Sequence, residues 1–204
     1  MRSDSDTIVA TRTLNDSRTR VARKPAGQAM VEFAVASIVA MIILFIGIQF
    51  AALARYAIEL NHLTYQVARW TTDSYNNNLK DSSNNPLASP QCADVKNLIT
   101  GSSVAPYQSM TNPAPGWVGK MAVNAGCGTA SNGGIAINLT CTAPGSGGTV
   151  SCSGQRPAGT QVQIAMSVDT KYVLFLSNPL SASYSFLGIP FPQTLNSSVS
   201  AFTQ

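Results

Sequence analysis

The feature that most constrains this chain is a single glutamate at the start of a long uncharged segment. Glu32 is followed by a run from Phe33 to Ala54 that contains no charged residue. As an α-helix this run would rise about 33 Å, and the hydrocarbon core of a bilayer is roughly 30 Å thick. A carboxylate just inside such a helix costs roughly 3 kcal/mol, so it usually has a partner and a task. The run therefore predicts a membrane span, and Glu32 is a candidate functional residue.

Positive charge is concentrated before this run. The residues up to Gly27 include six basic and three acidic side chains, whereas the rest of the 204-residue chain has seven and six. The positive-inside rule then holds the N-terminus in the cytoplasm and exports the part after the span. The net charge of +4 is explained by this topology, and we expect no nucleic-acid partner.

All four cysteines lie in the part that we expect to be exported, which is rich in Ser, Thr, Asn and Gly. An even number of cysteines in an exported domain predicts two disulfides, with three possible pairings. Cys141 and Cys152 flank the turn-rich segment Ala-Pro-Gly-Ser-Gly-Gly, which favours their pairing and leaves Cys92 with Cys127. A bond between Cys127 and Cys141 across the Ser-Asn-Gly-Gly turn remains open. No C-x-x-C pair is present, so we expect no metal site.

Two ordinary explanations of the N-terminal third are incomplete. A secretory signal peptide has an apolar core of about 7–15 residues followed by a small-x-small cleavage site, which residues 52–54 resemble. The apolar run here is longer, and a polar leader precedes it. An uncut single-pass anchor accounts for the length and the orientation, but it gives no reason for Glu32 or for the glycine five residues before it.

The segment Gly-Gln-Ala-Met-Val-Glu-Phe, from Gly27 to Phe33, resembles the motif cut by prepilin peptidases. It is most similar to the TadE-like pseudopilins of the tight-adherence (Flp) pilus system, whose motif is a glycine, four variable residues, and a glutamate followed by an aromatic. The resemblance implies cleavage after Gly27, a new N-terminus at Gln28, and Glu32 as the fifth mature residue. Gln28 departs from the apolar first residue of many other pilins.

The resemblance also implies partners and a location. The partners would be a prepilin peptidase, other pilin or pseudopilin subunits, a pilus assembly platform and the lipid bilayer. The chain would cross the bacterial inner membrane once, with its N-terminus in the cytoplasm and its C-terminal domain in the periplasm or outside the cell. Cleavage would leave an α-amino cation near the membrane surface, and Glu32 could pair with that cation on a neighbouring subunit. Such a pair would set the register between subunits, because an unpaired charge there is costly.

Apolar residues continue beyond the span at alternating steps of three and four, which is typical of an amphipathic helix. We call this set the stripe: Val35, Val39, Ile42, Ile46, Leu53, Tyr56, Leu60, Leu63, Val67 and Trp70, with Gln49 as its polar member. The pattern predicts one helix over residues 29–72. We expect the half after the span to pack against the chain's own exported domain.

The remaining chain predicts a small sheet domain. Residues 73–90 form a loop rich in Asn and Ser, residues 93–100 a short helix ended by Gly101, and the expected strands are 120–124, 135–141, 160–169 and 193–203. The apolar segment 171–192 is expected to pack on the core, or alternatively to form an exposed patch. The fold class is therefore α+β and pilin-like, with a long N-terminal transmembrane and stalk helix packed on a small antiparallel sheet domain with disulfides. The parts are a leader at 1–27, the helix at 28–72 and the exported domain at 73–204.

The sequence offers little for catalysis. Its one histidine, His62, lies on the expected stalk helix, and no phosphate-binding loop or dinucleotide motif is present. We expect no enzyme activity and no cofactor. The function predicted is a minor pilin-like structural subunit that assembles a tight-adherence or type IV-like pilus. The alternatives are a membrane-anchored extracytoplasmic binding protein and a pseudopilin of a secretion system.

Overall fold

A computed structural model of the chain describes residues 26–110, 121–130, 133–170, 185–186, 189–190 and 193–204. Nearly all of the basic leader and most of the apolar segment 171–192 lie outside the described residues, so the predictions for them stay predictions. The chain divides into two compact units, Met1–Ile43 and Leu44–Gln204, and each is described by itself.

Helix α1 (Ala26–Thr72) confirms the predicted helix of residues 29–72 and begins three residues earlier. In the first unit its apolar side chains are exposed, apart from half-buried Ile42; Met30 is 77% exposed and Phe33 is 75% exposed. Among the described residues, one helix, Gly27–Thr72, is long and apolar enough to cross a membrane by length and composition, and its most apolar window contains no buried residue. A helix of this kind is stable only where lipid or another protein covers it.

In the second unit the same helix forms the centre of the core. The stripe residues Leu53, Tyr56, Leu60, Leu63, Val67 and Trp70 are all buried. They form one apolar cluster with residues of the sheet and of a second helix. The prediction that this half of the helix packs against its own domain is therefore confirmed. Farther toward the N-terminus, Val35 and Val39 of the stripe are exposed.

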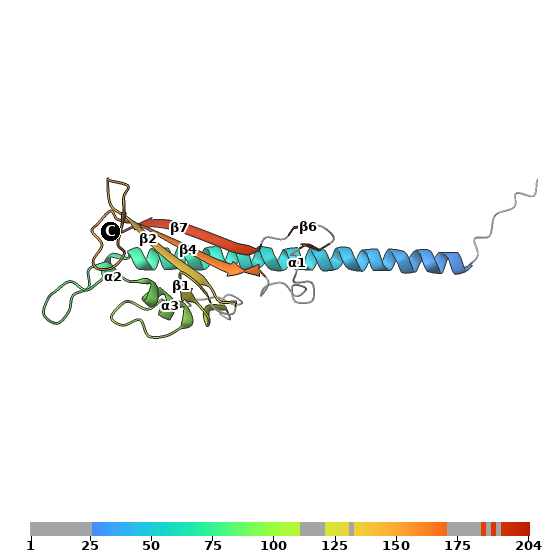
Figure 1. Cartoon of the computed structure of the whole chain (residues 1–204). Coiled ribbons are helices and arrows are strands. Elements are labelled where there is room, and N and C mark those ends of the chain that lie inside the picture. Colours follow the sequence, from blue (N-terminus) through green and yellow to red (C-terminus); the bar gives the residue numbers. More distant parts are fainter. Residues whose placement is uncertain (1–25, 111–120, 131–132, 171–184, 187–188, 191–192) are drawn as a thin grey trace, which may run out of the picture. The chain divides into compact units, whose positions relative to one another are not determined.

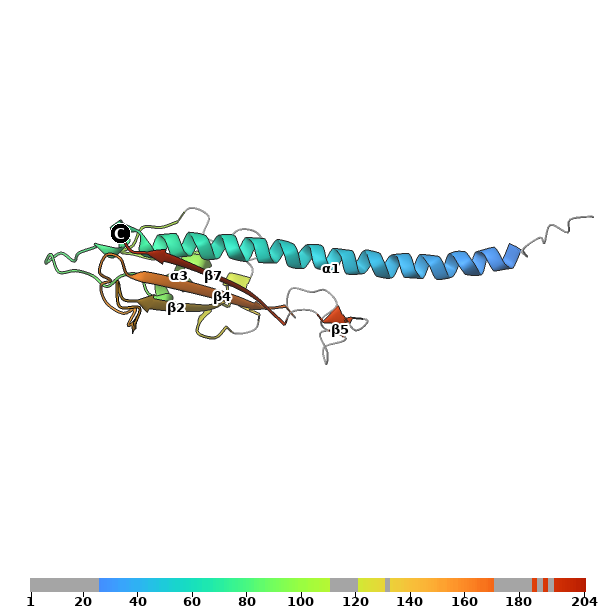
Figure 2. The ribbon, with the colours of Figure 1, turned by 90° about the horizontal axis from the view of Figure 1, so that it is seen from above.

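The sheet is built on three strands that the sequence predicts to within about one residue. They are β2 (Ala136–Thr142), β4 (Gln161–Asp169) and β7 (Thr194–Phe202), and they pair antiparallel in that order. In both ribbon views β4 and β7 run beside the carboxyl-terminal half of α1 (Figures 1 and 2). On β4, alternate residues Val162, Ile164, Met166 and Val168 are buried. The alternation gives the sheet one apolar face, as expected for an antiparallel sheet covered on one side.

Short strands complete the sheet and correct its predicted type. β1 (Gly126–Cys127) pairs parallel with β2, and β3 (Thr149–Val150) pairs antiparallel with it. The sheet is thus mixed and not purely antiparallel, because β1 runs in the same direction as its neighbour β2. Two further short strands, β5 (Ser185–Phe186) and β6 (Ile189–Pro190), pair only with each other among the described residues.

The strand predicted at 120–124 is wrong in its described part. Met121 and Ala122 are helical and the next two residues form a turn. Met121, Ala122 and Ala125 are buried, whereas Val123 and Asn124 are exposed. Buried residues at i and i+4 belong to a helical turn, and a five-residue apolar run is too short to separate that period from a strand's.

The segment after α1 is more ordered than the predicted loop. α2 (Ser74–Asn77) has Asp73 as its N-cap residue. The carboxylate of Asp73 accepts a hydrogen bond of 2.8 Å from the backbone N–H of Tyr75. The side-chain amide of Asn76 donates to the carbonyl of Trp70 (2.9 Å), one of the carbonyls that the end of a helix leaves without an intrahelical partner. Residues 73–78 therefore cap the end of α1.

The short helix predicted at residues 93–100 is confirmed as α3 (Cys92–Thr100). It ends at Gly101, which has the left-handed conformation (φ 75°) that glycine adopts without steric cost. The helix buries Val95, Leu98 and Ile99 in the same core as α1 and β4.

Removing a buried stripe residue tests this packing. Leu63 is 0% exposed, and Leu63→Ala leaves a cavity between α1 and the sheet, so we expect the free energy of unfolding to fall by about 2–5 kcal/mol. Ile58 is 70% exposed on the same helix, and Ile58→Ala is the control, with an expected change below about 0.5 kcal/mol. Denaturant unfolding of the chain in detergent, followed by tryptophan fluorescence, measures both. Equal losses would contradict the assigned core face.

Candidate processing and assembly site

Gly27 and Gln28 lie in the first turn of α1. The amide groups of a first helical turn have no intrahelical acceptors, so this turn unwinds at little cost into the extended backbone that a protease needs. A Cβ built on Gly27 meets no atom within 4 Å. The helix itself therefore does not require glycine here, and a requirement for glycine would come from an enzyme that acts on this bond.

Glu32 lies one turn farther along the same face as Gln28. The side-chain amide of Gln28 donates a hydrogen bond of 3.1 Å to Oε1 of Glu32, and both side chains are exposed. A carboxylate that accepts this bond retains acceptor capacity on its two oxygens. A second donor can therefore still bind Glu32.

Phe33 presents an exposed ring immediately after the carboxylate. With Met30 and Val31 it forms an exposed apolar surface on the sides of the helix away from Glu32, and each of the three is more than half exposed. Once lipid or a partner helix covers this surface, the charge of Glu32 would lie in a medium of low dielectric constant. Its interaction with an opposite charge is then far stronger than in water.

The structure thus places Gly27, Gln28, Glu32 and Phe33 together within the first two turns of one helix. The sequence assigned Gln28 only to the expected processing site, and its hydrogen bond to Glu32 was not predicted. The signal was present in the spacing, since residues four apart on a helix are neighbours and a glutamine there can bind an acidic side chain.

The four cysteines form two disulfides, Cys92–Cys127 and Cys141–Cys152. This is the pairing that the sequence favoured over Cys127–Cys141. The first bond joins the start of α3 to β1, with a Cα–Cα distance of 5.9 Å. The second joins β2 to the segment after β3, with a Cα–Cα distance of 5.3 Å. Both distances are in the usual range for a disulfide.

The other candidate groups show no site in the described part of the chain. His62 lies exposed on α1. Within the residues that the structure describes, no three His, Cys, Asp or Glu side chains gather as a metal-binding group.

Comparison with protein-family models, with curated proteins and with solved structures returns no significant match to this chain.

Mapping the disulfides chemically tests the two pairings. Trypsin separates Cys92 from the other three cysteines, so we expect the peptide that carries Cys92 to be recovered, without reduction, joined to the peptide that carries Cys127. A further digestion with thermolysin should then release Cys141 joined to Cys152. Mass spectrometry of both digests measures the linkages. A linked Cys127–Cys141 peptide, or Cys92 as a free thiol, would show the pairing to be wrong.

Proposed function

We propose that this chain is a minor pilin-like structural subunit, made as an inner-membrane precursor and processed by a prepilin peptidase for assembly of a tight-adherence pilus. One observation carries the proposal. A single helix, α1, begins at the glycine-to-glutamate motif, exposes an apolar surface through its first unit, and supplies the core stripe of a small disulfide-bonded domain in its second unit. A pilin subunit needs these three properties in one helix.

In this proposal Glu32 acts in assembly. The residue has a local hydrogen-bond donor in Gln28, which lowers the cost of placing a carboxylate beside apolar side chains. The α-amino group released by cleavage belongs to residue 28. It lies about one helical turn along the axis from Glu32 of the same chain. A neighbouring subunit shifted along the fibre axis can bring its own terminus to Glu32, and this pair would fix the stagger between subunits.

Blocking the cut tests the processing step. Gly27→Leu adds a bulky side chain at the scissile bond, where the helix has room for it. We therefore expect normal insertion but accumulation of the uncut precursor in cells that express the cognate peptidase. Gly47→Leu is the matched control, because a Cβ at Gly47 also meets nothing within 4 Å. Immunoblotting and the intact mass of the purified chain give the readout.

A mature chain that starts at Gln28 supports the pilin proposal. Normal processing of Gly27→Leu would show that the motif is accidental. An N-terminus at Met1 in the wild-type chain, in the presence of the peptidase, would favour the membrane-anchored binding protein instead.

Removing the charge of Glu32 tests assembly. Glu32→Gln keeps the size of the side chain and its hydrogen-bonding capacity but cannot form an ion pair. We expect unchanged membrane insertion and a fall of about tenfold in the recovery of partner subunits, because about 1.4 kcal/mol of lost interaction corresponds to that factor. Glu59→Gln is the control, since Glu59 forms its ion pair within the helix, with Arg55 at 2.9 Å. Co-purification from detergent-solubilised membranes measures recovery, and equal recovery from wild type and Glu32→Gln would exclude the registration role.

A further inference from the structure

Arg156 is the one buried side chain in an otherwise exposed segment. Residues 143–159, all of which the structure describes, are half-buried or exposed except for this arginine, which is 6% exposed. Val150, the large apolar residue of the segment, is among the exposed hydrophobic side chains. Apolar burial therefore contributes little to holding this segment on the domain, and its anchors include the Cys141–Cys152 disulfide, the two-residue strand β3 and Arg156.

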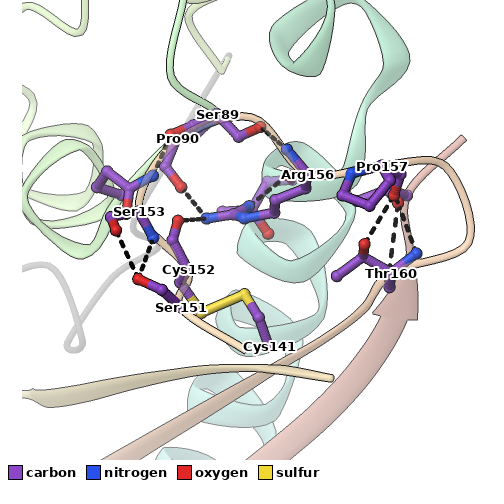
Figure 3. Close-up of a disulfide and its surroundings, with 12 residues drawn as sticks. Ser89, Pro90, Cys141, Ser151, Cys152, Ser153, Arg156, Pro157 and Thr160 are labelled. Carbon is purple, nitrogen blue, oxygen red and sulfur yellow. Dashed lines mark hydrogen bonds between the residues drawn. A yellow bond between two sulfur atoms is a disulfide. The ribbon is translucent and has the colours of Figure 1, made fainter. Parts of the chain in front are cut away.

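The arginine joins three parts of the second unit. Nη1 donates to the carbonyl of Thr71 at 3.2 Å, near the end of α1, and Nη2 donates to the carbonyl of Pro90, in the loop before α3. Nη2 also approaches the carbonyl of Cys152 at 3.5 Å, so the disulfide-bonded residue itself is an acceptor (Figure 3). A cation at the end of a helix is favourable, because the carbonyls there carry partial negative charge.

Backbone contacts hold the same loop against the segment. The backbone N–H of Arg156 donates to the hydroxyl of Ser89 (3.1 Å), and the N–H of Ser89 donates to the carbonyl of Gly154 (2.9 Å). Residues 154–156 and residues 89–90 thus hold each other in place. If either segment moves away, the other loses its hydrogen-bond partners.

We call the buried position of the Arg156 side chain its seat. The hydrogen bonding at this seat is incomplete. Nε of Arg156 is buried without a hydrogen-bond partner among the described residues, and so is Oδ1 of Asn77, whose amide binds the same Thr71 carbonyl. Burial lowers the pKa of Arg156 to about 10, while nearby Tyr107 and Asp94 act in the opposite direction. The guanidinium remains charged at neutral pH, so its desolvation opposes seating. A restraint that holds the segment near the seat is therefore needed.

The two flanks of Arg156 are restrained differently. On the carboxyl side, the carbonyl of Pro157 accepts hydrogen bonds from the hydroxyls of Thr160 and Thr203 at 2.7 Å, which tie this flank to the end of β7. On the amino side, the covalent restraint is the disulfide at Cys152, four residues away. The amino flank should therefore depend on the redox state and the carboxyl flank should not.

We propose that the Cys141–Cys152 disulfide is an oxidation-dependent lock, which seats Arg156 against Thr71 and so fixes the carboxyl end of α1 to the rest of the second unit. Reduction by a dithiol breaks the S–S bond and delivers two electrons and two protons. Two cysteine thiols form, and the dithiol becomes a cyclic disulfide. The freed segment then withdraws Arg156, and the end of α1 loses its tie to the loop before α3. The inference does not depend on the proposed function.

The test measures backbone hydrogen exchange by mass spectrometry on the full-length chain in detergent. The background is Cys92→Ser/Cys127→Ser, so that dithiothreitol reduces one defined disulfide. We expect reduction to speed exchange about tenfold in residues 70–78 and 86–91, as in a local opening. Residues 193–203, including the Thr203 tie, serve as the internal reference and should change less than about twofold.

Arg156→Met in the same background separates the lock from general loosening. Residues 70–78 should already exchange fast in the oxidised chain, and reduction should add nothing further there. Arg69→Met is the matched control. Arg69 is an exposed arginine near the end of α1, and its loss should leave the response to reduction intact. If the background does not fold, Cys141→Ser/Cys152→Ser with Cys92–Cys127 retained gives the same readout. Protection of residues 70–78 that survives reduction, or a full response in Arg156→Met, would overturn the proposal.

Discussion

The structure of the second unit depends on one contact, the packing of the α1 stripe against the apolar face of the sheet. Leu60, Leu63 and Val67 are almost completely buried, and they belong to one apolar cluster with alternate residues of β4. The helical period of about 3.6 residues and the strand period of two must both present apolar residues to the same interface. The same helix carries the apolar surface of the first unit. One continuous helix therefore carries both the apolar surface that requires lipid or protein cover and the residues that form the core of the second unit.

Polar contacts complete a core that apolar side chains alone do not close. The end of α1 is surrounded by Asn76, Asn77 and Arg156, whose side chains bind backbone carbonyls. Two disulfides attach α3 and the segment after β3 to the sheet. A disulfide stabilises mainly by restricting the unfolded chain, which matters most where little apolar area is buried. In the proposed lock, disulfide formation and the burial of Arg156 are thus connected at the carboxyl end of α1.

The candidate site at the other end of α1 has a different physical basis. Gly27, Gln28, Glu32 and Phe33 lie on one continuous helix, so their mutual placement follows from helix geometry without any long-range contact. Its chemistry would come from a peptidase and from neighbouring subunits. The local hydrogen bond between Gln28 and Glu32 is a preorganised feature that this chain supplies itself.

Local patterns in the sequence predicted the features that depend on neighbouring residues. These are α1 with its buried stripe, α3 with Gly101 at its end, and the three long strands, because each has a clear apolar period or a stop signal. Tertiary structure decided the rest. The residues at 121–122 are helical because burial at i and i+4 outweighs strand propensity in a short run. The parallel β1 and the seat of Arg156 could not be predicted, since the carbonyls that bind this arginine belong to Thr71 and Pro90, 85 and 66 residues earlier. A Gln-Arg-Pro sequence in a Gly/Ser-rich segment is typical of an exposed loop, and only the folded chain supplies the acceptors that make its burial possible.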